Sequence, residues 1–182
     1  ENHALHGQST IEIKQMTAKE EDILTSRTLL KNGVAIDRVL QSLIMNKAIN
    51  ADTLLVGDRN AILIAARTSG YGNEYNTNVS CPACGATQEY SFDLNSAEIH
   101  AGAANPTLGI VDNRDGTFTT TLPRTQVQVS FRLLDGTDEK NMMAQAENAR
   151  KRKRPEQAVT TQIRSMVVSV NGDETTQALN YL

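Results

Sequence analysis

The residues that decide the fold class are 58–93, which read DRNAILIAARTSGYGNEYNTNVSCPACGATQEYSFD. The first part is a near-continuous apolar run that predicts a helix over residues 59–69, with Asp58 available as its N-cap. After Gly72 the pattern changes to a strict alternation of side chains, which is typical of a strand. We therefore expect a helix followed by antiparallel strands. Because the helix has so little polar surface, we also expect it to be the most buried element.

The second part of this stretch predicts a β-hairpin with a cysteine turn at its tip. Alternating residues 75–79 lead into the turn and alternating residues 88–92 lead out of it. The turn itself, residues 81–85, reads CPACG. Rubredoxin-like knuckles use such a turn to present two thiolates to one metal, because the turn directs backbone amides at the sulfurs and the glycine permits a positive φ. We predict that the sulfurs of Cys81 and Cys84 converge.

Zinc is the only cofactor that the sequence suggests, and its ligand set is left open. A tetrahedral zinc site needs four ligands, whereas the chain has two cysteines. His100 follows Cys84 at a spacing that suits a zinc ribbon, and a second copy of the chain could supply two further thiolates. His3 and His6 could instead complete a Cys2His2 site. A metal-free turn and a redox or disulfide pair are the other interpretations, although the strand pattern after the turn disfavours thioredoxin-like chemistry.

Before the decisive stretch, the sequence predicts a strand and two helices. Residues 10–14 alternate like a short strand. Thr17 and Glu20 have the form of a capping box, and the helix behind them is expected to end at Gly33. Apolar residues at helical spacing predict a second helix over residues 36–44.

After the decisive stretch, we expect a loop, a second hairpin and two helices. Residues 101–116 read as a loop. The hairpin strands are expected at 117–122 and 127–133, and a helix at 139–153. Residues 158–170 fit either a helix or a strand, because 167–170 has strand propensity; we favour a helix over 158–168, followed by a turn at 171–173. The inward-facing side chains of the second hairpin strand are expected to be Val127, Val129, Phe131 and Leu133.

The predicted fold class is α+β, with an N-terminal helical part, β-hairpins of which one is zinc-ribbon-like and carries the CxxC knuckle, and C-terminal helices. We divide the chain at 1–72, 73–134 and 135–182, or treat it as one composite domain. The apolar pattern is cut off at Leu182, so we expect the 182 residues to be part of a longer protein.

Composition excludes several functional classes. The longest apolar run, residues 61–66, is far shorter than a membrane span. The net charge is −3 and aromatic residues make up 4 %, which argues against acidic membranes and against a stacking platform for nucleic acid. No nucleophile elbow, phosphate loop or acid–base pair is present in the sequence, so we predict no catalytic residues and no enzymatic activity.

The sharpest charged feature is a basic run near the end of a predicted helix. A helix C-terminus favours positive charge, so the run is expected to be solvated there or to meet an acidic partner. Nucleic acid is the alternative partner, although no neighbouring aromatic residues support it. The run consists of Arg150, Lys151, Arg152, Lys153 and Arg154.

Seven blocks, taken in their order along the chain, resemble the T4-type bacteriophage base plate hub protein family. The similarity covers residues 16–172. The blocks are MTAKEEDIL (16–24), LLVGDRNAILIAAR (54–67), YGNEY (71–75), CPACG (81–85), FDL (92–94), FRLLDGTDE (131–139) and VSVNG (168–172).

The resemblance implies a structural or assembly protein of a contractile phage tail, without enzymatic activity. Its implied partners are other baseplate, hub or tail-tube proteins, in several symmetry-related copies, and its implied place is the tail baseplate of the virion after assembly in the host cytoplasm. The alternative function is a zinc-knuckle adaptor that binds nucleic acid or a protein through residues 150–154.

Overall fold

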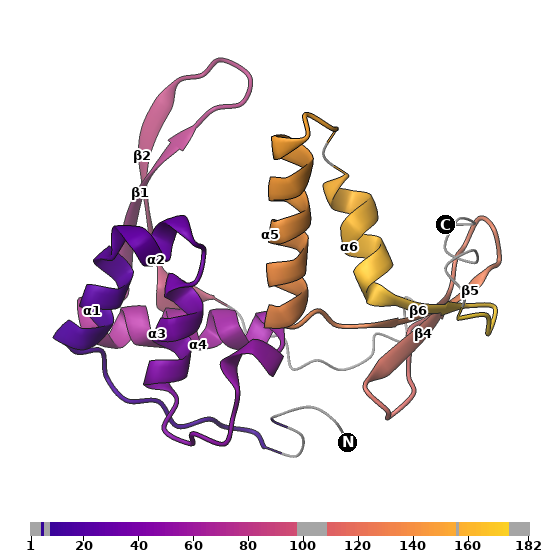
Figure 1. Ribbon diagram of the computed structural model, residues 1–182, viewed down its shortest axis with the longest axis horizontal. Coiled ribbons are helices and arrows are strands. Elements are labelled where there is room, and N and C mark those ends of the chain that lie inside the picture. The colour runs from indigo at the N-terminus through magenta and orange to yellow at the C-terminus, as the bar shows by residue number, and fades with distance from the viewer. Residues whose placement is uncertain (1–4, 6–7, 98–108, 156, 175–182) are drawn as a thin grey trace. The chain divides into compact units, whose positions relative to one another are not determined.

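The computed structural model describes residues 5, 8–97, 109–155 and 157–174, which form two compact units (Figure 1). Of the described residues, 10–48 and 58–97 make up the helix–hairpin unit, and 5, 8–9, 49–57, 109–155 and 157–174 make up the sheet unit. Helices and antiparallel sheets occur together, so the α+β class is confirmed in its coarse form.

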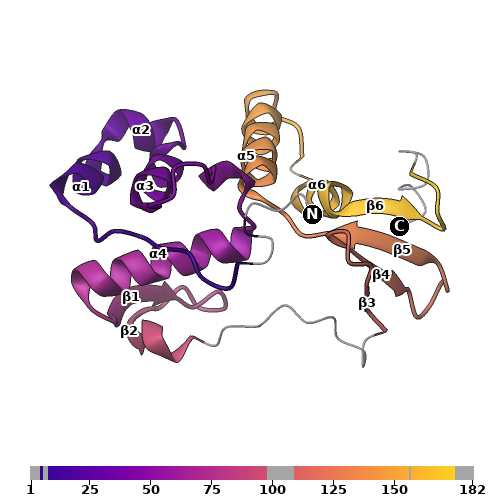
Figure 2. The same ribbon diagram turned by 90° about the horizontal axis from the view of Figure 1, so that it is seen from below.

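The helix–hairpin unit consists of four helices followed by a two-stranded ribbon. Figure 2 shows α1, α2 and α3 on one side of α4 and the ribbon on the other. The first two residues of α4, Val56 and Gly57, belong to the sheet unit, and the rest of that helix belongs here. The elements are α1 (Ala18–Thr25), α2 (Arg27–Lys31), α3 (Ala35–Leu43), α4 (Val56–Tyr71), β1 (Glu74–Ser80), β2 (Thr87–Asp93) and the short 3-10 helix η2 (Leu94–Ser96).

Helix α3, and not α4, is the most buried element of this unit. Four residues of α3 are buried, and two of them, Val39 and Leu43, pack against Ala66 of α4. In α4, Ile62 is 3 % exposed whereas Ile64 is 37 % exposed. The prediction for α4 was wrong because its apolar residues run around the helix, while only one face can reach the core. Asp58 lies in the first turn and is not the N-cap, since α4 begins at Val56.

The beginning of the chain also departs from expectation. The predicted strand 10–14 is reduced to a single bridge between Ile13 and Ile44. The capping box of Thr17 and Glu20 is confirmed, but the helix that it begins ends at Thr25. A new helix starts there because the Ser26 hydroxyl accepts a hydrogen bond from the Leu29 N–H and caps α2.

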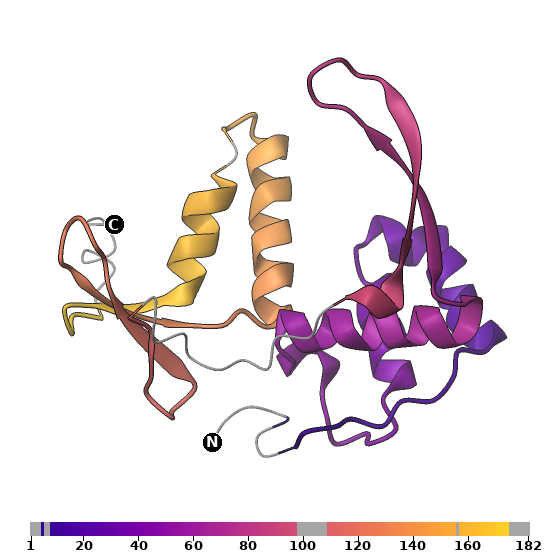
Figure 3. The same cartoon turned by 180° about the vertical axis from the view of Figure 1, so that it is seen from behind.

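The first predicted hairpin is confirmed. β1 and β2 pair in antiparallel register from Glu74–Asp93 at the base to Ser80–Thr87 at the tip. The turn that carries the cysteines therefore lies at the end of the ribbon farthest from α4 (Figure 3).

The sheet unit contains a four-stranded antiparallel sheet in the order β3-β4-β5-β6 and a helical hairpin. Asp135 caps α5, with Asp138 three residues on, so this helix begins at Gly136 and ends at Lys151 instead of spanning the expected residues 139–153. The elements are the 3-10 helix η1 (Ala51–Thr53), β3 (Val111–Asp112), β4 (Thr117–Thr121), β5 (Gln128–Arg132), α5 (Gly136–Lys151), α6 (Ala158–Met166) and β6 (Val167–Val170).

Three expectations for this unit need correction. Strand β3 lies inside the predicted loop 101–116. Helix α6 ends at Met166 and the chain continues as β6, because the β-branched residues that follow pair with β5. Of the expected inward set, Val129 is buried while Leu133 is exposed, since β5 ends before Leu133.

Candidate interaction sites

The backbone of the cysteine turn is closed by two hydrogen bonds. The Cys81 N–H donates to the Ala86 carbonyl at 2.8 Å, and the Gly85 N–H donates to the Cys81 carbonyl at 2.8 Å. Gly85 has a φ of +71°, which explains why a glycine stands at this position. The predicted tight turn between two strands is therefore present.

Within this turn the two cysteines are neighbours. The pKa of Cys81 is lowered, first by the Cys84 N–H, then by the Ala83 N–H and by the Cys84 thiol. Cys81 is half-buried and Cys84 exposed, and both are free thiols. Backbone donors that favour the thiolate are what a metal-binding sulfur requires.

Whether these thiols bind zinc stays a prediction. Within the part of the chain that the structure describes, no group of three or more His, Cys, Asp or Glu side chains could hold a metal ion. The proposed completing ligands, His3, His6 and His100, lie outside the described residues.

One face of the ribbon is largely apolar and exposed to solvent. Tyr75 lies opposite Phe92 with ring centroids 5.2 Å apart, and Tyr90 lies 5.9 Å from Phe92. Tyr90 is 51 % exposed, and Val79 farther toward the tip is exposed as well. The alternation in the sequence predicted which residues share this face. The alternation alone could not show that these side chains remain exposed to solvent.

The opposite face of the ribbon is polar throughout. Because side chains alternate along a strand and the register is regular, the intervening residues of both strands share this second face. These residues are Glu74, Asn76, Asn78, Ser80, Thr87, Glu89, Ser91 and Asp93.

Arg67 of α4 fixes the base of the ribbon. Its guanidinium lies over the rings of Tyr71 and Tyr75, at 5.0 and 6.0 Å from their centroids. It also donates to the carbonyls of Gly72 and Glu74, at 2.9 and 3.4 Å. The ribbon is thus anchored at one end, while its tip extends away from the helices of its unit (Figure 1).

The basic run lies at the end of α5. Arg150 and Lys151 belong to the last helical turn, and Arg152 is the C-cap. All five side chains are exposed, and Lys151 forms an exposed ion pair with Glu147 at 2.7 Å. This placement agrees with the expected favourable interaction between positive charge and a helix C-terminus.

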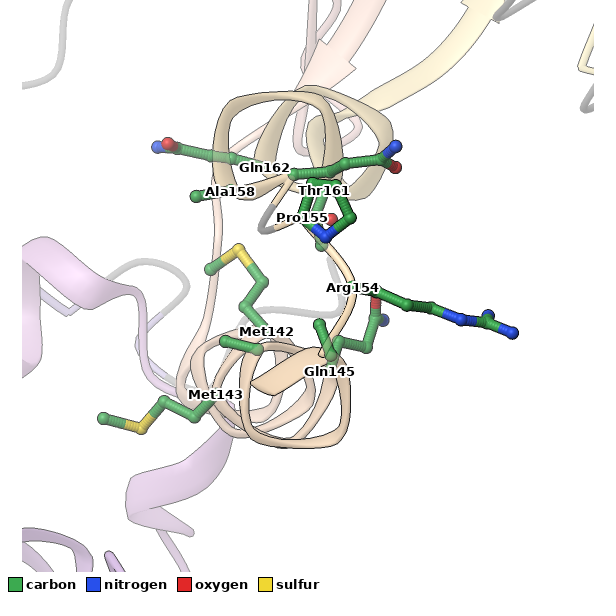
Figure 4. A pocket seen from close by; sticks show the side chains of 11 residues that line it. Met142, Met143, Gln145, Arg154, Pro155, Ala158, Thr161 and Gln162 are labelled. Carbon is green, nitrogen blue, oxygen red and sulfur yellow. The ribbon is translucent and has the colours of Figure 1, made fainter. Parts of the chain in front are cut away.

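A cleft of about 560 Å³ lies between α5 and α6, next to the basic run. Figure 4 shows Met142 reaching from α5 toward α6, with Met143 and Arg154 projecting at opposite edges of the cleft. Met143 is 66 % exposed, which is unusual for such an apolar side chain. The lining residues are Met142, Met143, Gln145, Ala146, Ala149, Arg154, Pro155, Gln157, Ala158, Thr161 and Gln162.

The sequence identifies Glu20 only as part of a helix capping box, and does not predict that its carboxylate is buried. Glu20 is fully buried and accepts hydrogen bonds from Lys14 at 2.7 Å and from the Ser42 hydroxyl at 2.5 Å. The N–H and hydroxyl of Thr17 also donate to it. These donors, Lys14 above all, hold the pKa of Glu20 far below its ordinary value. The network connects α1 to α3 and is structural, because the carboxylate is fully partnered and closed to solvent.

None of the described helices combines the length and apolar character that crossing a bilayer demands. No curated protein and no solved structure matches the chain significantly. One family model does match, over residues 2–116, and its description is T4 bacteriophage base plate protein. The match covers more than half of the 182 residues. This chain therefore belongs to the family of T4 bacteriophage base plate proteins.

Proposed function

We propose that this chain is a non-catalytic structural component of the hub region of a contractile phage tail baseplate. Family membership supports the baseplate role. The observation that carries the proposal is the amount of apolar surface left uncovered, on the ribbon and around the α5–α6 cleft. Soluble monomers rarely expose such patches, whereas assembly components bury them against neighbours.

Its partners in this proposal are other baseplate, hub or tail-tube proteins, present in several symmetry-related copies. The chain would be assembled in the host cytoplasm and stay in the virion. The hub position agrees with the resemblance of the seven sequence blocks, of which the last two lie beyond the matched residues.

The α5–α6 cleft is the surface on which we place a contact with another tail protein. Met143 of α5 and Val159 of α6 are exposed apolar side chains, and Arg154, the last residue of the basic run, lines the same cleft as Met143. An amphipathic helix with acidic residues at one end suits both features, because its apolar side fills the cleft and its acids meet the run. Residues 150–154 are the partner-contact residues of this proposal.

Assembly of tails with variant chains tests the proposal. Met143→Asp places a charge at the edge of the cleft and should reduce incorporation into baseplates by about tenfold or more. Ala144→Asp is the matched control, since Ala144 is exposed on the same helix but does not line the cleft. Equal, wild-type incorporation of both variants would contradict a contact at this site.

A second candidate function is suggested by the exposure of the basic run. The chain would then be a zinc-knuckle adaptor that binds nucleic acid through residues 150–154. Tight DNA binding that weakens steeply with added salt would favour it, because phosphate contacts release counterions. Absence of such binding at low salt favours the baseplate partner.

A further inference from the structure

We propose that the tip of the β1–β2 ribbon is half of a zinc site, which a second copy of this chain completes. The four ligands are the sulfurs of Cys81 and Cys84 from each copy. This inference concerns the ribbon alone and is independent of the contact proposed at the α5–α6 cleft.

The geometry of the cysteine turn supports a shared metal site. Cys81 and Cys84 stand three residues apart in a tight turn, which is closed by the hydrogen bonds from the Cys81 N–H to the Ala86 carbonyl and from the Gly85 N–H to the Cys81 carbonyl. This arrangement suits two thiolates on one metal ion. Structural zinc takes four ligands, and the described residues provide no group of three or more metal-binding side chains. We place the remaining two ligands on a second copy of the chain, because an identical turn supplies an identical pair.

The second argument is the position of the turn. It lies at the far end of a two-stranded ribbon whose base is held by Arg67. Cys84 is exposed, so a second protein chain can approach its sulfur directly. A two-stranded hairpin is marginal by itself, and a partner would stabilise it.

The third argument comes from the aromatic face, which is independent of the cysteines. Its residues include no charged side chain, while the acidic residues Glu74, Glu89 and Asp93 all occupy the opposite face. The Arg67 guanidinium lies over the ring of Tyr75 at the base of this face. Two copies can therefore stack through its tip half, around Val79 and Tyr90, without bringing like charges together. The face consists of Tyr75, Thr77, Val79, Gln88, Tyr90 and Phe92.

A two-fold axis along the ribbon satisfies all three observations. It places the same apolar face on both sides of the interface, as an isologous contact requires. It also brings both tips to the same end, where the two cysteine pairs meet. On binding, four thiols release four protons to solvent and their thiolates coordinate one Zn²⁺, so the affinity rises with pH.

Metal content and mass of the reduced chain test the proposal. We expect one zinc ion per two chains, a dimer in solution, and dissociation into monomers when a chelator removes the metal. Titration with Co²⁺ should saturate at half an equivalent per chain, with the strong sulfur-to-metal absorption of a four-thiolate site. Cys84→Ser should lose the metal and the dimer, whereas Asn78→Ala, on the polar face of β1, should keep both.

Other outcomes overturn the proposal. One metal ion per monomer, lost in His100→Ala or in the double variant His3→Ala with His6→Ala, would show completion within the chain. A reduced chain that binds neither Zn²⁺ nor Co²⁺ would show that the turn is metal-free. Far-ultraviolet circular dichroism shows whether Cys84→Ser has lost its fold as well as the metal. Tyr90→Asp leaves all thiols in place and should weaken the dimer. Because these experiments test the ribbon alone, their failure leaves the contact proposed at the α5–α6 cleft untouched.

Discussion

The two hairpins of this protein have similar sequence patterns and different surroundings. Hairpin β4–β5 has a further strand on each side, β3 and β6, and its Val129 is 5 % exposed. Ribbon β1–β2 is a sheet by itself, and its Tyr90 is 51 % exposed. Alternation sets which side chains share a face, but burial depends on whether other segments cover that face. A well-formed apolar face without a cover is therefore informative about partners.

The largest expected effect is the difference between the two hairpins in the loss of unfolding free energy when one carboxylate is introduced into each. Val129→Asp puts an unpaired carboxylate into a buried position and should lower the free energy of unfolding by about 3–5 kcal/mol. Tyr90→Asp should change it by less than about 1 kcal/mol in the metal-free monomer, because the site is already in water. Urea denaturation of both variants measures the difference, and equal losses would contradict the contrast.

The helices at the base of the ribbon depend on the Glu20 network. Glu20→Gln removes the charge that pairs with Lys14 and should lower the free energy of unfolding by about 2–3 kcal/mol near neutral pH. Asp22→Asn is the control, since Asp22 is exposed in the same helix and should change stability by less than about 0.5 kcal/mol.

The same carboxylate predicts a pH dependence. The pKa of Glu20 is lower in the folded state than in the unfolded chain, so its contribution is complete above about pH 4.3 and is lost as the pH falls further. Denaturation at about pH 6 and about pH 3 should show a larger loss for the wild type than for Glu20→Gln. An identical loss in both proteins would show that Glu20 does not titrate in this way.

Arg67 should control the order of the ribbon more than global stability. Arg67→Ala removes two carbonyl hydrogen bonds and the packing over two tyrosine rings, at a cost of about 1–2 kcal/mol. Hydrogen exchange should accelerate in β1 and β2 and stay unchanged in α3. Acceleration throughout the unit would mean that the ribbon is not a separate element of stability.

The smallest expected effect concerns the basic run. Lys151→Gln combined with Lys153→Gln should change the free energy of unfolding by no more than about 0.5 kcal/mol, because both side chains are solvated. Thermal denaturation tests this directly. If unchanged stability accompanies failed incorporation into tails, the run contacts a partner; if stability falls, its role is internal.

Much of the local structure was predictable because it depends on neighbouring residues. The ribbon, its turn, hairpin β4–β5 and the capping box of Thr17 and Glu20 follow from alternation, glycine placement and side-chain capping. The errors lie where distant segments compete. Val167–Val170 became a strand because β5 was available as a partner, and Ile64 remained exposed because α3 reaches only one face of α4.

The candidate sites divide in the same way. The cysteine pair and the basic run are each contiguous in the chain, so the amino-acid sequence alone is enough to find them. The α5–α6 cleft and the exposure of the aromatic face depend on which surfaces the fold leaves uncovered. The order of residue types along the chain does not show which surfaces the fold leaves uncovered.

The central claim is that the apolar surfaces left open by this chain are interfaces of the assembled baseplate. An electron-microscopy map of intact tails that contain the chain tests it most directly. We predict that Tyr75, Tyr90 and Phe92 are covered by a second copy, with metal density between the two cysteine turns, and that a neighbouring protein fills the α5–α6 cleft. A map in which the aromatic face and the cleft both remain in solvent would contradict the account.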